Sequence, residues 1–235
     1  MKKVTLLNII TALILQIMVV VSGFVIPKII LTYFGSGING LVSSINQFLS
    51  YITLVEGGIT GVIMANLYKP LIEEDTVELS SVMVASKKFY EKIGLIFIAY
   101  TILLAVVYPI LWGRDYSFIF VFFLVLILSI TLMVQYMFSL TLKSLLSADK
   151  KLYIVNFTQI IIVVLNVILA YVSVKIYPSI HILKLISGVL FVLQPLIFGQ
   201  YVKRNYDIDW KAIPNNDLIK ERWNGFAINI AACIH

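Results

Sequence analysis

Six stretches of this chain are apolar for long enough to cross a lipid bilayer. A helix needs about 20 mostly apolar residues to span roughly 30 Å of hydrocarbon. The stretches of that length are residues 5–27, 41–64, 93–112, 117–141, 152–174 and 183–201. Because backbone groups in lipid must be satisfied within their own segment, the pattern predicts helices. We therefore expect an all-α, polytopic membrane protein.

Short polar or glycine-rich segments separate these apolar stretches. A glycine turn is predicted at 34–40 (FGSGING), and the next connections fall at 112–116, 147–151 and 176–179. Pro195 predicts a kink inside the last stretch, which membrane helices tolerate because neighbouring groups satisfy the freed backbone.

The start of the chain has two interpretations. Lys2 and Lys3 followed by an apolar run are typical of a signal peptide. However, the run continues from Val4 to Ile26, well beyond the usual 7–15 or so apolar residues of a signal peptide, and no A-x-A site follows it. The pattern favours a retained first span.

Composition and charge support the membrane assignment and predict its orientation. Charged residues make up only 13% of the chain, against about 25% in soluble domains. Of the 18 lysine and arginine residues, 14 fall on the same side of the six stretches as the N-terminus. Because cytoplasmic loops are enriched in these residues, the N-terminus is predicted to be cytoplasmic. The net charge of +6 then faces anionic membrane lipid, so no nucleic-acid partner is expected.

The apolar pattern divides the chain into three parts. Residues 1–202 are predicted to form a six-helix transmembrane lobe, and 203–222 a cytoplasmic linker. Residues 223–235 are too few to cross a membrane, and they are predicted to be the start of a truncated seventh span. We expect the N-terminal part of a longer protein, with a natural half-size protein as the alternative. The other long charged stretch, 66–92, is predicted to include an amphipathic surface helix that enters the third span.

No motif in the sequence indicates catalysis. Cys233 is the single cysteine, and His181 and His235 are isolated, so no metal-ligand spacing occurs. Glycine-rich nucleotide motifs and nucleophile elbows are also missing from the sequence. We expect a protein that is not an enzyme and that needs no cofactor or metal ion.

The second apolar stretch is the most polar of the six. At 100° per residue, its polar side chains share one arc of about 120°. These residues are Ser43, Asn46, Gln47, Ser50 and Thr53. The opposite side carries Leu41, Ile45, Phe48, Leu49 and Ile52. Glu56 follows beyond the arc, and a charge inside a membrane costs about 2.5–3.5 kcal/mol.

Two interpretations of this polar stripe stay open. The stripe and Glu56 line an aqueous cavity, or the polar groups hold helices together at about 0.6 kcal/mol per contact. In the second interpretation Glu56 reaches the interface or pairs with a lysine there. Polar residues in other spans, such as Asn8, Thr11, Asn156 and Asn166, favour a central cavity.

The region from residue 24 to residue 71 also resembles a known family. The matching features are Pro27, Tyr33-Phe34-Gly35, Gly40-Leu41, Glu56-Gly57-Gly58-Ile59 and Leu67-Tyr68-Lys69-Pro70. In these features the chain resembles the N-terminal signature of polysaccharide flippases, a branch of the multidrug/oligosaccharidyl-lipid/polysaccharide exporter superfamily. The likeness in length and hydropathy extends through the sixth span.

The resemblance implies a fold and a function. Proteins of this family have two six-helix lobes around a central cavity, sit in the cell membrane and pass lipid-pyrophosphate-linked oligosaccharides across it. This chain would supply the N-terminal lobe, and its partner would be a missing C-terminal lobe or a second copy. Relatives place basic residues in the cavity of this lobe, and here Lys28 is the nearest match. Arg114 and Lys184 are secondary candidates, although each also suits a side chain that reaches the membrane surface.

Three other functions compete with this one. A drug exporter of the same superfamily would also use acidic residues in this lobe. A membrane enzyme of polysaccharide synthesis would need a sizeable outside loop, whereas the predicted outside loops are short, with Asp115 as their only carboxylate. A six-helix accessory subunit is the third alternative.

Overall fold

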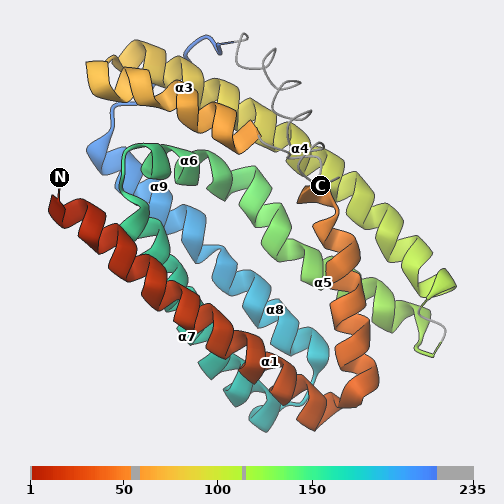
Figure 1. The fold of residues 1–235 in the computed structure, drawn as a ribbon. Coiled ribbons are helices and arrows are strands. Elements are labelled where there is room, and N and C mark those ends of the chain that lie inside the picture. The colour runs from red at the N-terminus through yellow and green to blue at the C-terminus, as the bar shows by residue number, and fades with distance from the viewer. Residues whose placement is uncertain (1, 54–58, 113–114, 216–235) are drawn as a thin grey trace, which may run out of the picture.

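The computed structural model describes residues 2–53, 59–112 and 115–215, which form helices joined by loops, without a β-strand. The elements are α1 (Lys2–Ser50), α3 (Ile59–Glu73), α4 (Thr76–Leu111), α5 (Phe118–Val134), the π-helical turn η1 (Gln135–Ser139), α6 (Leu140–Ala148), α7 (Leu152–Ile176), α8 (Ile180–Phe191) and α9 (Leu193–Asn205) (Figure 1). The prediction of an all-α fold is confirmed for these residues.

Five helical segments within the described residues are long and apolar enough to cross a membrane. They are Lys3–Ser50, Thr76–Leu111, Phe118–Ala148, Leu152–Ile176 and Ile180–Asn205. The protein is therefore a multi-pass membrane protein. The predicted span 41–64 is not a separate segment in this set, because it is divided between α1, residues outside the described parts, and α3. The count of six spans and the orientation of the N-terminus stay predictions.

Helix α1 consists of two limbs that meet at Gly35. At this residue φ is 82° and ψ is 173°, a conformation open essentially only to glycine. The chain reverses there, so that the first limb (2–34) and the second limb (36–50) run in opposite directions (Figure 1). The predicted turn over 34–40 is too long, because one glycine makes the reversal and Ser36 already resumes the helix.

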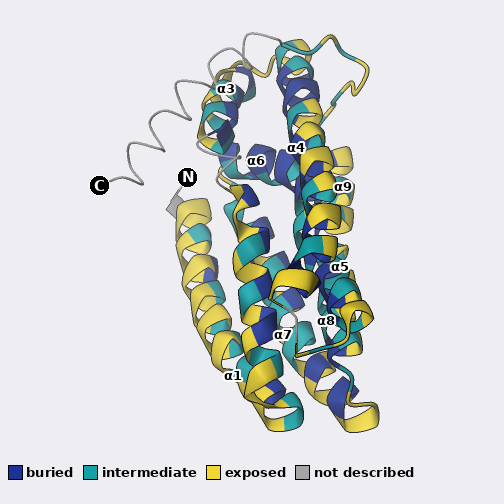
Figure 2. Ribbon diagram, turned by 90° about the vertical axis from the view of Figure 1, so that its right-hand side faces the viewer, coloured by how far each residue is buried: buried dark blue, intermediate teal, exposed yellow. Residues whose placement is uncertain are grey.

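Polar side chains join the first limb to α7 and to the loop before it through hydrogen bonds. The Asn8 amide donates to the carbonyl of Lys150 and accepts from the amide of Tyr153, both at 2.8 Å. One turn further, Asn156 donates to the Thr11 hydroxyl at 3.2 Å. Asn8, Thr11 and Asn156 therefore use their polar groups in contacts between segments of the protein. They join two helices, and most of the apolar surface of the first limb is left exposed (Figure 2).

Helices α3 and α4 form a helical hairpin before α4 continues along the molecule (Figure 1). The Asp75 carboxylate accepts hydrogen bonds from the amides of Val77 and Glu78, which fixes the start of α4. From there α4 continues unbroken to Leu111, as the prediction of a surface helix entering the third span implied. Helix α3 packs against α4 and α6.

The segment after α9, residues 206–215, returns to α4, and we call it the strap. At its start, the Tyr206 hydroxyl donates to Asp149 and accepts from Lys151 in the α6–α7 loop. Burial, and then the bond to Asp149, raise the pKa of Tyr206 far above its usual value. At its end, the Ser81 hydroxyl donates to the carbonyl of Ile213 at 2.7 Å. Part of the predicted linker 203–222 is thus packed against the helices.

We expect Gly35→Ala to destabilise the protein by about 1–3 kcal/mol, because alanine is strained at this positive φ. Gly40→Ala is the matched control, since neither position has a heavy atom within 4 Å of an added Cβ and Gly40 is helical. The control should be neutral or stabilising, because alanine is the better helix former. Unfolding in mixed detergent micelles measures both changes, and equal effects of the two variants would contradict the role of Gly35.

Candidate functional site

The second limb of α1 turns its apolar face into the protein and its polar face outward. Ile45 and Leu49 are buried, at 0% and 1% exposure, and the Phe48 ring packs against the Tyr108 and Trp112 rings. The polar stripe is exposed along its whole described length. Its residues are Ser43, Asn46, Gln47, Ser50 and Thr53. The predicted amphipathic character of this span is confirmed.

Some side chains of this polar stripe have hydrogen-bonding groups that no described residue uses. The hydroxyls of Ser43, Ser50 and Thr53 each donate to a backbone carbonyl three or four residues earlier, at 2.7–2.9 Å. The side-chain amides of Asn46 and Gln47 make no hydrogen bond within residues 2–53, 59–112 and 115–215. These two amides are therefore the groups of the stripe that are most available to a ligand.

A cavity of about 350 Å³ begins beside Asn46. Side chains from both limbs of α1 and from α5, α7 and α8 surround it. Its polar lining comes from Asn46, Thr131, Asn166, Lys184 and Ser187. Its apolar lining includes Ile26, Leu128, Leu132 and Phe191. The cavity thus combines apolar walls with a few converging polar groups, which is the usual make-up of a small-molecule site.

Lys184 supplies the positive charge of this cavity. The side chain is half-buried on α8, and it forms no ion pair with any described residue. No aspartate or glutamate lines the cavity in the described part of the chain. A lysine in a membrane-spanning helix is costly and normally finds a partner, so a charge without one is a candidate binding group.

Asn166 and Ser187 add directed donors beside this charge. The Ser187 hydroxyl donates to the Asn166 side-chain oxygen at 2.7 Å, which leaves the Asn166 amide hydrogens for the cavity. Three members of the lining come from one face of α8, because Lys184, Ser187 and Phe191 follow the helical spacing. An ammonium group and an amide NH₂ group together favour a ligand rich in acceptor oxygens.

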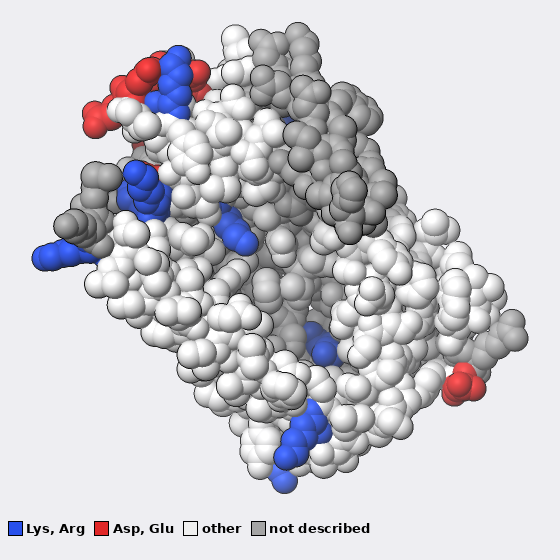
Figure 3. Space-filling model, in the orientation of Figure 1, with Lys and Arg blue, Asp and Glu red and all other residues white. Residues whose placement is uncertain are grey.

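The surface around the cavity is concave. Figure 3 shows a hollow between the two limbs of α1, with lysine or arginine side chains reaching into it. Among the described residues no acidic side chain is visible inside this hollow (Figure 3). The cavity likewise lies between the two limbs of α1, and its lining includes Asn46 of the polar stripe and Lys184.

The structure brings together only some of the residues predicted as the site. Asn46 and Lys184 line one cavity, whereas Lys28 is exposed on α1 and does not line it. Glu56 and Arg114 lie outside the described residues. Sequence reasoning counted Asn166 only among the polar residues that favour a central cavity. It did not select Ser187, although the spacing of Ser187 three residues after Lys184 was a signal that both share a helical face.

Comparison with known proteins adds no identification. No family model matches the chain, and no curated protein or solved structure is significantly similar to it.

We expect cysteines at Asn46 and Ser50 to react with a membrane-impermeant thiol reagent at least about tenfold faster than cysteines at Ile45 and Leu49, because water reaches the polar stripe and not the buried face. Each substitution is made in a Cys233→Ser chain and measured as a labelling rate in membranes.

A cysteine that faces lipid provides the control for exposure without water. Leu13 is 61% exposed on the first limb, so Leu13→Cys reports a side chain in contact with hydrocarbon. If cysteines at Asn46 and Ser50 label as slowly as this one, the stripe does not face water, and the interpretation as helix-packing contacts is favoured.

Proposed function

We propose that the chain is one lobe of a transporter that passes a lipid-linked oligosaccharide across the cell membrane. In this proposal the lobe contains six spans and its N-terminus is cytoplasmic. The observation that carries the proposal is the cavity containing Lys184 and Asn46, which opens next to an exposed polar helical face. A passive membrane anchor needs neither feature.

The chemistry of the cavity supports an anionic, oxygen-rich substrate. Lys184 attracts a phosphate or pyrophosphate group, and the amides of Asn46 and Asn166 donate to phosphate or sugar oxygens. The apolar walls accommodate the part of the substrate nearest the lipid chain. The family resemblance of residues 24–71 suggests the same class of substrate.

The transporting unit needs a second body opposite the hollow. A polar helical face is unfavourable against lipid, and the hollow between the two limbs of α1 is open toward the viewer in Figure 3. In alternating access, one helical bundle moves against another around a site near the middle of the membrane. We propose that a second lobe or a second copy of this chain closes the passage.

We expect Lys184→Met to lower polymer display by about tenfold or more, since losing one charge-assisted contact costs about 1.5–3 kcal/mol. Lys184→Arg should keep most of the activity. The measurement is surface polymer in a strain that lacks its own flippase and carries the transporter formed with this chain.

The matched control is Lys175→Met, which removes the same charge outside the cavity. Lys175 lies beside the Tyr33 and Tyr171 rings at the end of α7. Equal losses for the two methionine variants would contradict a special role of Lys184. If polymer display never depends on this chain but resistance to cationic drugs does, the drug-exporter alternative replaces the proposal.

A further inference from the structure

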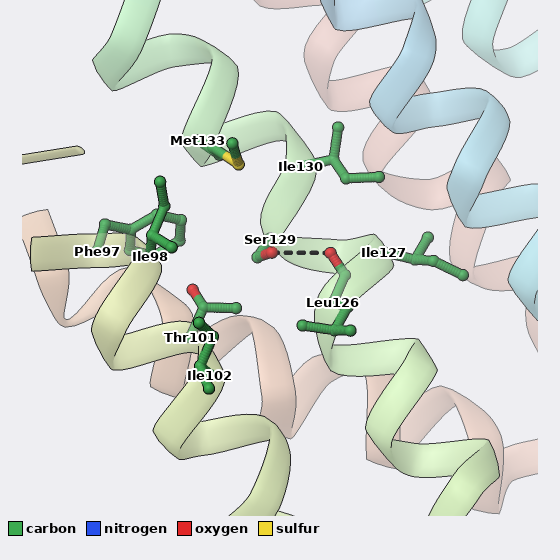
Figure 4. A pocket seen from close by; sticks show the side chains of 9 residues that line it. All are labelled: Phe97, Ile98, Thr101, Ile102, Leu126, Ile127, Ser129, Ile130 and Met133. Atoms are coloured by element: carbon green, nitrogen blue, oxygen red, sulfur yellow. Dashed lines mark hydrogen bonds between the residues drawn. The ribbon is translucent and has the colours of Figure 1, made fainter. Parts of the chain in front are cut away.

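A groove between α4 and α5 is separate from the Lys184 cavity. Its volume is about 290 Å³, and side chains of these two helices line it (Figure 4). Ile102 and Met133 of this lining are exposed, so the groove opens to the surface of the protein. Among the described residues, the linings of the groove and of the cavity share only Ile127. The polar groups of the two spaces are therefore different.

The groove is apolar apart from two hydroxyl groups. Thr101 of α4 and Ser129 of α5 are each 5% exposed. Figure 4 shows the two side chains on the facing sides of their helices, with the Thr101 oxygen pointing into the space between them. The rest of the lining consists of phenylalanine, isoleucine, leucine and methionine side chains. Apolar walls with a few polar groups are the usual make-up of a small-molecule site.

The two hydroxyls differ in the hydrogen-bonding capacity that they have left. Ser129 Oγ donates to the Leu126 carbonyl oxygen at 2.7 Å, which uses its hydrogen and leaves its oxygen as an acceptor. Thr101 Oγ1 is buried without a hydrogen-bond partner among the described residues, so its hydrogen is unused. A buried polar group without a partner costs stability, and a helical threonine can avoid this cost by donating to the carbonyl four residues earlier. The groove therefore presents an unused donor on α4 and an acceptor on α5.

Both hydroxyls lie near the middle of their membrane-spanning segments. Thr101 is ten residues before the end of α4 at Leu111, and Ser129 is eleven residues after the start of α5 at Phe118. At 1.5 Å per residue, each is about 15 Å from that end of its helix, which is half the thickness of the hydrocarbon layer. Phospholipid ester groups lie outside this layer. An ordinary lipid chain thus brings only hydrocarbon to this depth and leaves the Thr101 hydroxyl unpaired.

The volume of the groove limits the size of an occupant. A protein cavity of about 150 Å³ holds one benzene molecule, so a groove of about 290 Å³ suits a molecule of roughly two benzene rings. We propose that the groove binds a neutral, apolar alcohol of this size, which enters from the lipid. The hydroxyl oxygen of the ligand accepts from Thr101, and its hydrogen is donated to Ser129. This site is additional to the proposed transport site and does not depend on it.

Photolabelling in nanodiscs tests the site with three molecules of one carbon skeleton. Benzophenone, diphenylmethanol and diphenylmethane all carry two phenyl rings, and their central carbon bears a ketone, a hydroxyl or neither. Irradiated benzophenone forms a carbon–carbon bond to a neighbouring side chain, and mass spectrometry of the full chain locates the adduct. Diphenylmethanol and diphenylmethane are then compared as competitors of this labelling at equal concentrations in the membrane.

We expect benzophenone adducts at the groove, with Met133 and Ile102 at its exposed rim among the labelled residues. Diphenylmethanol should compete at a concentration at least about fivefold lower than diphenylmethane, because it adds two hydrogen bonds to the same apolar contact. Thr101→Val keeps the shape of the side chain but removes the donor, so it should lower this ratio at least about twofold. Without ligand, the same variant should raise the Tm by about 2–4 °C, because an unpaired buried hydroxyl is removed.

Thr158→Val is the matched control. Thr158 is 2% exposed on α7, away from the groove, and its hydroxyl donates to the Ile154 carbonyl at 2.8 Å. The change removes a hydroxyl that is already paired. This variant should keep the competition ratio of the wild type, and it should not raise the Tm.

Three results would overturn the proposal. Adducts spread over exposed apolar positions such as Leu13, without enrichment at the groove, would indicate ordinary contact with the lipid phase. Equal competition by diphenylmethanol and diphenylmethane would show that the groove takes up hydrocarbon without regard to a hydroxyl. The last is a Thr101→Val variant that folds, as judged by its Tm, and keeps the full ratio, or a Thr158→Val variant that loses it equally. No transport assay enters this test, so failure of the proposed function and failure of the alcohol site are separate outcomes.

Discussion

A polar helical face cannot lie against hydrocarbon without a cost, and this constraint governs the second limb of α1. The limb buries Ile45 and Leu49 and exposes Asn46 and Gln47. In a soluble protein this is the ordinary arrangement, but in a membrane it leaves amides where lipid would be. Water or another protein surface must therefore cover this face. The second body that we propose opposite the hollow would meet that requirement, and so would water in the hollow.

Polar groups within the helices of this protein serve two different purposes, and their pairing distinguishes them. Asn8 uses both its donor and its acceptor to join α1 to the start of α7. Lys184 forms no ion pair with the described residues, and Asn166 uses its oxygen on Ser187 and keeps its donors. Paired groups hold helices in place, whereas groups with unused hydrogen-bonding capacity are available to a ligand. The same residue types thus form helix contacts in one place and a candidate site in another.

The helices around the cavity differ in regularity. Helix α7 is continuous from Leu152 to Ile176, whereas the π-helical turn η1 follows α5 a few residues after Leu132 of the cavity lining. The strap connects the ends of α9 and α6 to α4, because Tyr206 bonds to Asp149 and Ser81 bonds to Ile213.

The sequence by itself determined the helical membrane fold, the apolar and polar faces of the second limb, and most loop positions, because apolar length and 3.6-residue periodicity are local properties. Only the tertiary structure decided which polar residues meet. It placed Asn8 against α7 and Asn166 beside Lys184, and it separated Lys28 from the cavity. Pro195 predicted the irregularity between α8 and α9 at Val192, whereas no local signal predicted η1. A π-helical turn depends on how α4, α5 and α9 pack, and such contacts between distant segments cannot be read from one stretch of sequence.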